Sequence, residues 1–132
     1  MNMPLNKYAV FTLFMLILIA GAIFSADTGY ANAPIQLIQQ LPLGDKWTHA
    51  ILYGSLAFGL GSSFMPGFTK LGLARAVLCV GVFTFVEEFS QYWFPLRTVD
   101  AGDLVANVIG LSIAHYGLWR TKKAHKLMRK AG

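Results

Sequence analysis

Two adjacent acidic residues stand out near the middle of the chain. Glu87 and Glu88 lie in the stretch FVEEFSQYW, which is otherwise mostly apolar and aromatic, and Gln91 follows within one helical turn. A carboxyl group in apolar surroundings has a raised pKa, and such a group can act as a general acid or base. A carboxylate can instead hold a cationic side chain through a charge-assisted hydrogen bond. The stretch therefore predicts either a reactive site or a buried polar network.

Other polar residues recur at helical spacing in two further apolar segments. Asp45 and His49 are four residues apart, as are Asp103 and Asn107. Residues at this spacing share one face of a helix. Gly110 continues the second stripe and would let another helix approach closely. Asp103 also fits the N-cap of a helix.

These polar groups are expected to meet at one level and to form the functional site. The predicted site residues are Asp45, Lys46, His49, Tyr53, Glu87, Glu88, Gln91, Arg97, Asp100, Asp103 and Asn107.

Four apolar runs would position these residues. They cover about residues 8–26, 47–64, 72–94 and 104–119. A helix needs about 20 apolar residues to cross a bilayer core. The chain is also 55% hydrophobic and only 13% charged, whereas a water-exposed surface needs many charges. We therefore expect an all-α integral membrane bundle of four transmembrane helices with short loops, in a single domain over residues 1–132.

The basic residues predict the orientation of this bundle. Of the eleven Lys and Arg residues, only Lys46 and Arg97 fall in the two loops that carry the polar site. By the positive-inside rule, both termini would be cytoplasmic and the site would face outward. The expected location is a cytoplasmic membrane, in a multi-pass arrangement. The basic tail, residues 120–132, is expected to contact anionic lipid and not nucleic acid.

The first apolar run has a second interpretation. Lys7, the run itself and the tripeptide ANA at 31–33 resemble a secretory signal with an A-x-A cleavage site. The run is longer than a typical signal core, and Pro34 directly after the tripeptide would hinder cleavage. These features favour a retained helix.

Established signatures of catalysis and metal binding do not occur in the chain. There is no H-E-x-x-H, P-loop or nucleophile-elbow motif, and Cys79 is the single cysteine. A disulfide framework and a cysteine metal site are therefore excluded. We expect no metal and no cofactor from these spacings.

Three segments resemble the motifs of the VanZ-like family of bacterial membrane proteins. They are DKWTHAILYG at 45–54, EEFSQYWFPLRTVDAGD at 87–103 and DLVANVIG at 103–110. The family pattern is D-K-x-x-H-x-x-x-Y, then E-x-x-Q, an Arg in the next loop, and D-x-x-x-N-x-x-G. It matches Asp45, Lys46, His49, Tyr53, Glu88, Gln91, Arg97, Asp103, Asn107 and Gly110. The resemblance covers about residues 7–120 and implies a link to low-level resistance to glycopeptide antibiotics such as teicoplanin.

Several functions fit this polar site. In the preferred interpretation it binds an envelope lipid or a lipid-linked head group of an envelope precursor, with Arg97 and Lys46 contacting phosphate or carboxylate. Alternatively, the protein is an enzyme in which Glu88 is the general acid or base, His49 carries a second proton and Arg97 stabilises an anionic intermediate. The residues could also form a purely structural network with an accessory role in a membrane complex. A transport or channel role is also open, although four short helices are few for a transporter unless the protein oligomerises, and the oligomeric state is left open.

Overall fold

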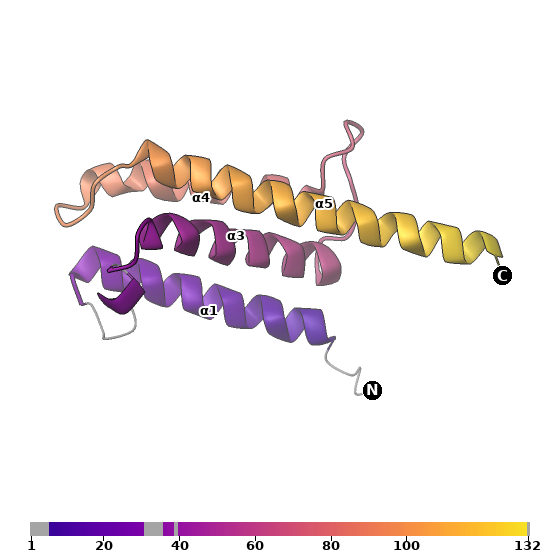
Figure 1. The fold of residues 1–132 in the computed structure, drawn as a ribbon, viewed down its shortest axis with the longest axis horizontal. Coiled ribbons are helices and arrows are strands. Elements are labelled where there is room, and N and C mark those ends of the chain that lie inside the picture. Colours follow the sequence, from indigo (N-terminus) through magenta and orange to yellow (C-terminus); the bar gives the residue numbers. More distant parts are fainter. Residues whose placement is uncertain (1–5, 31–35, 39, 132) are drawn as a thin grey trace.

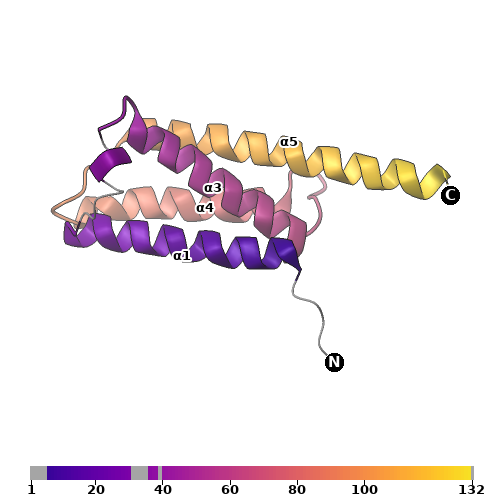
Figure 2. The same cartoon turned by 60° about the horizontal axis from the view of Figure 1, so that its bottom comes forward.

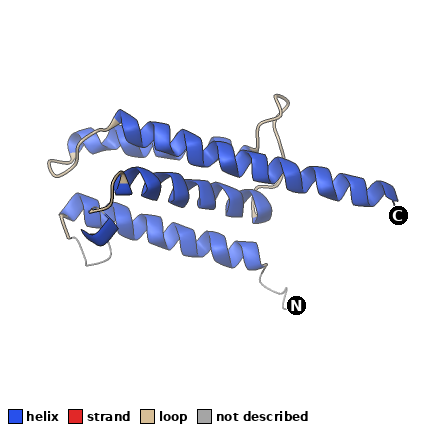
Figure 3. Cartoon of the chain, viewed as in Figure 1, coloured by secondary structure: helices blue, strands red, loops and turns tan. Residues whose placement is uncertain are grey.

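The chain forms a bundle of roughly parallel and antiparallel helices (Figures 1 and 2). The computed structural model describes residues 6–30, 36–38 and 40–131. The elements are α1 (Lys7–Thr28), α3 (Gly44–Ser63), α4 (Arg75–Ser90), the 3-10 helix η1 (Gln91–Trp93) and α5 (Ala101–Ala131). Within the described residues the regular elements are all helical, as Figure 3 shows, apart from an isolated bridge between Phe68 and Ala74.

The expected bundle of four transmembrane helices is wrong. Within the described ranges, only α1 is both long and apolar enough to cross a membrane. The run predicted as a helix over 72–94 forms a helix of 16 residues before it tightens into η1; at 1.5 Å per residue that is about 24 Å, short of the roughly 30 Å of a bilayer core. Helix α3 carries Asp45, Lys46 and His49 in its first two turns, and the last third of α5 is basic.

Helix α3 lies at the centre of the bundle, in contact with α1, α4 and α5. The core is a cluster of apolar side chains from all four long helices. Its buried members are Met15, Ile19, Tyr53, Leu56, Ala57, Val80, Leu111 and Ala114. Two of them, Met15 and Ile19, come from α1, so the first helix is part of the packed core.

Helices α3 and α5 approach closely where their glycines meet. A Cβ added to Gly110 would lie 2.1 Å from the carbonyl oxygen of Ala50, and one added to Gly54 would lie 2.7 Å from the carbonyl oxygen of Gly110. Both distances are far below a van der Waals contact, so only glycine fits at this crossing. The prediction that Gly110 permits close helix approach is confirmed.

The two ends of the bundle differ in charge. The beginning of α1, the α3–α4 loop and the end of α5 lie together at one end (Figure 1). That end holds the nine Lys and Arg residues other than Lys46 and Arg97. The predicted basic tail continues α5 as an exposed helix.

Candidate functional site

All six acidic residues of the chain gather at the opposite end of the bundle. They lie at the ends of α1 and α4, at the start of α3, and just before or within the first turn of α5. They are Asp27, Asp45, Glu87, Glu88, Asp100 and Asp103. Only two cations, Lys46 and Arg97, share this acidic end. Six acids against two cations leave a formal charge of −4 there, in a chain whose net charge is +5.

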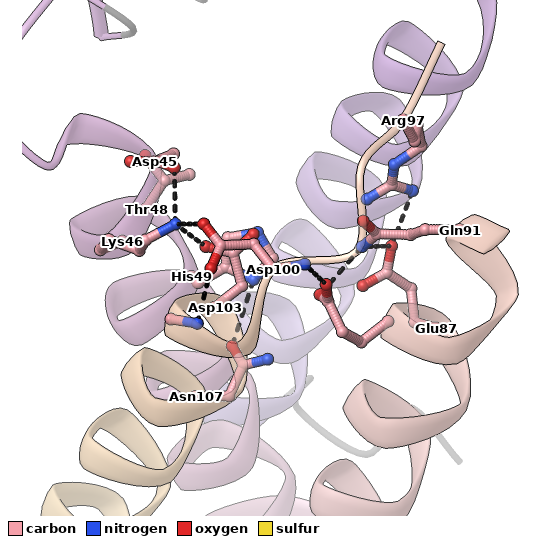
Figure 4. A network of polar contacts seen from close by, with 12 residues as sticks. Asp45, Lys46, Thr48, His49, Glu87, Gln91, Arg97, Asp100, Asp103 and Asn107 are labelled. Atoms are coloured by element: carbon pink, nitrogen blue, oxygen red, sulfur yellow. Dashed lines mark hydrogen bonds and ion pairs between the residues drawn. The ribbon is translucent and has the colours of Figure 1, made fainter. Parts of the chain in front are cut away.

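Lys46 binds three aspartates that come from two helices and a loop. Its Nζ lies 2.9 Å from Asp45 Oδ2 and 2.7 Å from Asp103 Oδ1, and it also donates to Asp100 Oδ2 (Figure 4). Burial alone would lower the pKa of Lys46, but these hydrogen bonds outweigh burial and raise the pKa. The same bonds lower the pKa of Asp45 and Asp100. The Lys46 ammonium therefore stays charged and occupies the space between the three carboxylates.

Asp100 begins α5. Its Oδ1 accepts a hydrogen bond from the Gly102 N–H at 2.7 Å, which is the contact of an N-cap. The expectation that Asp103 caps this helix is therefore wrong. Because Asp103 lies within the first turn of α5 instead, its carboxylate is free to face Lys46 and His49.

Arg97 joins the loop before α5 to α4 and α1. Its Nη1 lies 2.8 Å from Glu87 Oε1 and 3.1 Å from Asp27 Oδ1, and the Arg97 and Glu87 side chains are only 11% and 5% exposed. Tyr53 adds α3 to the cluster by donating to Glu87 Oε2 at 3.3 Å. Burial and the nearby Glu87 charge both raise the pKa of Tyr53, so its hydroxyl remains a donor.

Glu88 is the most deeply buried acid, at 1% exposure. Its Oε1 accepts from the Asp100 N–H and its Oε2 from Gln91 Nε2, both at 2.9 Å. The structure shows no ion pair of Glu88 within the described part of the chain. Burial raises the pKa of Glu88, and the nearby charges of Asp103 and Glu87 raise it further. The hydrogen bond from the Asp100 N–H acts in the opposite direction and lowers the pKa. Glu88 is thus a carboxylate held by hydrogen bonds without a cationic partner.

His49 lies between the two polar side chains of α5. Its Nδ1 is 3.3 Å from Asn107 Oδ1, and its Nε2 is 3.6 Å from Asp103 Oδ2. Asn107 is 1% exposed, and its Nδ2 has no hydrogen-bond partner among the described residues. A buried amide N–H without an acceptor is costly and rare in proteins. The residues that the structure describes thus leave this N–H without an acceptor oxygen.

A cavity of about 510 Å³ opens beside this network. Asp45, His49, Arg97 and Asp103 line its polar side, while the last turns of α1 form a wall of small residues. Further polar lining residues were not predicted from the sequence, because small hydroxyl residues near loops carry no spacing signal. They are Ser25, Thr48 and Thr98. The cavity thus combines a charged wall with one built on the apolar helix α1.

A larger cavity, of about 910 Å³, lies at the basic end. Lys122, Lys126, Arg129 and Lys130 line it together with Tyr8 from α1. None of the predicted site residues belongs to it. Its basic lining suits anionic groups. That the tail contacts anionic lipid stays a prediction.

The structure brings all eleven predicted site residues to the acidic end. Both cations are already paired with acidic residues: Lys46 contacts aspartates, and Arg97 contacts Glu87 and Asp27. That these residues bind a ligand stays a prediction.

Glu88→Gln is expected to remove a pH dependence of stability. Burial raises the pKa of Glu88 above its usual value of 4.5, so the folded protein binds this proton more tightly than the unfolded chain does. The stability that this proton contributes is fully present below pH 4.5, and it is lost as the pH rises through the raised pKa. A neutral Gln abolishes this loss, so the melting temperature at neutral pH should equal or exceed that of the wild type. Thermal unfolding in detergent from acidic to neutral pH measures this, and a melting temperature several degrees lower at neutral pH would contradict it.

Comparison with known proteins adds no relative. No family model, no curated protein and no solved structure matches the chain. The resemblance to VanZ-like proteins is therefore carried only by the quoted motifs.

Proposed function

We propose that this chain is a VanZ-like protein of a bacterial membrane and that the cavity at the acidic end binds the head group of an envelope lipid or lipid-linked precursor. One observation supports this most directly. The cavity is built on Ala22, Ser25, Ala26 and Gly29, at the C-terminal end of the helix that could cross a bilayer. Lipid head groups lie at that level of a membrane, where a spanning helix ends.

The surface of α1 supports a membrane setting. The helix has 22 residues, about 33 Å at 1.5 Å per residue, which matches the roughly 30 Å of a bilayer core. Ile17 and Phe24 on this helix are 72% and 65% exposed. Val82 and Phe85 on α4 are similarly exposed, at 66% and 62%. Apolar surfaces of this kind mark sites of contact with a membrane or a partner.

The packing of α1 favours a retained helix over a cleaved signal. Met15 and Ile19 are 5% and 3% exposed, and both belong to the hydrophobic core. Cleavage after the tripeptide at 31–33, which lies outside the described residues, would remove them and expose the face of α3 that packs against α1. We expect the intact mass of the membrane-extracted protein to include α1. A mature protein that starts near residue 34 would contradict this.

Charge favours placing the basic end on the cytoplasmic side. Lys7 begins α1, and Lys70, Arg75 and the last third of α5 lie at the same end of the bundle. Cytoplasmic positions are enriched in Lys and Arg, and the anionic lipids of that leaflet attract them. The acidic cavity then faces the opposite side, where envelope precursors are displayed.

The ion pairs narrow the chemistry of the head group. Lys46 and Arg97 are already bound to carboxylates, so a phosphate would have to compete with those pairs. The excess of acids instead favours groups that donate hydrogen bonds. The ligand that fits best therefore carries hydroxyl or amino groups, as sugar and amino head groups do.

The enzyme alternative is less well supported by this geometry. Glu88, its proposed acid or base, does not line the cavity, and both of its oxygens accept hydrogen bonds from Gln91 and Asp100. A proton transfer would require Glu88 to exchange one of these partners for the ligand. The structural alternative accounts for the ion pairs but not for the unsatisfied Asn107 amide.

Filling the cavity should separate head-group binding from structure. Ala26 lines the cavity and is exposed, so Ala26→Trp should fill part of it without touching an ion pair. We expect this variant to bind envelope-lipid vesicles at least about tenfold more weakly, with an unchanged melting temperature. Ala20→Trp is the matched control, because Ala20 is exposed on the same helix but outside the cavity. Equal vesicle binding by both variants would contradict the proposal.

A further inference from the structure

Three potential metal ligands converge at the acidic end from three different helices. One ligand atom each from His49 on α3, Glu88 on α4 and Asp103 on α5 lies within 4.8 Å of the other two. Glu88 and Asp103 are buried, and His49 is partly buried. Imidazole and carboxylate groups together are a common ligand set for divalent transition metals.

The contact between His49 and Asn107 is compatible with the ring orientation that metal binding needs. Its Nδ1 lies at the Asn107 carbonyl oxygen, which can only accept a hydrogen bond. In the tautomer with the proton on Nδ1, that proton is donated to Asn107 Oδ1 and Nε2 carries the lone pair toward Asp103. Metal-bound histidines are oriented in this way, with the second ring nitrogen donating to an oxygen.

The spacing of the ligand atoms suits an ion between them. His49 Nε2 and Asp103 Oδ2 are 3.6 Å apart, too far for a good hydrogen bond. Two atoms bound tetrahedrally to one Zn²⁺ at about 2.1 Å lie about 3.4 Å apart. Asp103 can serve Lys46 and a metal at once, because Oδ1 contacts the ammonium while Oδ2 faces His49.

The unsatisfied amide of Asn107 is an independent sign of a missing ligand. Asn107 is 1% exposed, and its Nδ2 lacks an acceptor among the described residues. The side chain lies directly beside His49, one helical turn after Asp103 (Figure 4). A water or head-group oxygen bound to a metal at His49 and Asp103 would supply the acceptor that Nδ2 requires.

Charge also favours a cation at this position. The second acidic group at this end, formed by Asp45, Asp100 and Asp103, already surrounds the Lys46 ammonium. Glu88 has no such partner within the described residues, although it lies in an end with a formal charge of −4. A divalent ion would neutralise half of that excess.

We propose that His49, Glu88 and Asp103 bind one divalent transition-metal ion of the Zn²⁺ or Mn²⁺ class, with Asn107 donating to an oxygen on the ion. Glu88 follows His49 by 39 residues, and Asp103 follows Glu88 by 15. The three ligands lie on separate helices, so no local sequence motif identifies them. Metal binding does not depend on head-group binding. Because His49 and Asp103 also line the cavity, the ion would meet a head-group oxygen there if the proposed function holds.

The test is calorimetric titration of the full chain in detergent, after treatment with a chelator, with Zn²⁺, Mn²⁺ and Mg²⁺. We expect one Zn²⁺ or Mn²⁺ per chain and much weaker binding of Mg²⁺, which avoids imidazole. His49→Ala should lower the Zn²⁺ affinity at least about tenfold, as loss of even an outer-shell partner does. His125→Ala is the matched control, because His125 is exposed at the basic end. Absence of Zn²⁺ and Mn²⁺ binding by the folded wild type, or equal losses in both variants, would overturn the proposal.

A second pair of variants guards against loss of folding. Glu88→Gln should weaken Zn²⁺ binding while the protein stays folded, whereas Asn107→Ala should weaken it about 10–100-fold through the outer shell. The absorption spectrum of bound Co²⁺ reports nitrogen and oxygen ligands directly, and it should change in His49→Ala and not in His125→Ala. A Co²⁺ spectrum identical in wild type and His49→Ala would also overturn the proposal. Vesicle binding measured with and without chelator distinguishes the two ideas, because metal binding without lipid binding refutes only the proposed function.

Discussion

Arg97→Ala is expected to lower the free energy of unfolding by about 3–5 kcal/mol, the usual cost of removing one partner from a buried ion pair. Arg97 is the cation for both Glu87 and Asp27, at 2.8 Å and 3.1 Å. Without it, the buried Glu87 carboxyl group loses its cationic partner and lies beside Glu88. The variant also releases the loop before α5 from α1 and α4, so both stability and any head-group binding should fall.

Lys70→Ala is the control for this variant. It removes a cation of the basic end whose residue is exposed, and its effect should stay within about 0.5 kcal/mol, as for most surface substitutions. Chemical unfolding in detergent, followed by circular dichroism, compares the two. Similar unfolding midpoints for Arg97→Ala and Lys70→Ala would show that the Arg97 pairs contribute little.

The sequence predicted the members of the polar cluster better than their partners. Helical spacing places Asp45 with His49 and Asp103 with Asn107, because each pair shares a helix face. Spacing says nothing about the return path of the loop at 94–100, which brings Arg97 to Glu87 and sends the Asp100 N–H to Glu88. Neighbouring residues on a helix point about 100° apart, so Glu87 and Glu88 necessarily have different surroundings.

The prediction of four spans failed because apolar runs and helices do not coincide. The run at 72–94 includes the non-helical residues 72–74 before Arg75 and the 3-10 helix after Ser90, and both shorten the α-helix. Residues 47–64 continue from a polar first turn that contains Asp45 and Lys46, which belong to the same helix. Helix α1 alone combines length with an uninterrupted apolar sequence.

Gly110→Ala is expected to destabilise the protein by about 3 kcal/mol, at the upper end of the usual cost of overpacking. The added Cβ would lie 2.1 Å from the carbonyl oxygen of Ala50 and 2.8 Å from its carbonyl carbon. Backbone atoms cannot rotate away as a side chain can, so α3 and α5 must separate. Because His49 and Asn107 lie within one turn of this crossing, their 3.3 Å contact should lengthen and ligand binding at the acidic end should weaken.

Gly21→Ala separates this clash from the general effect of replacing glycine in a helix. A Cβ at Gly21 meets nothing within 4 Å, so this change should stabilise α1 by about 0.5–1 kcal/mol through reduced unfolded-state entropy.

The double variant of Gly54→Ala and Gly110→Ala provides a further check. The two glycines face each other, so helices already separated by one substitution accept the second at little extra cost, and the effects should be clearly less than additive. Thermal unfolding of the wild type, the two single variants Gly54→Ala and Gly110→Ala, and the double variant measures this coupling. Additive losses, or a Gly110→Ala protein as stable as Gly21→Ala, would mean that the two helices are not in close contact at this crossing.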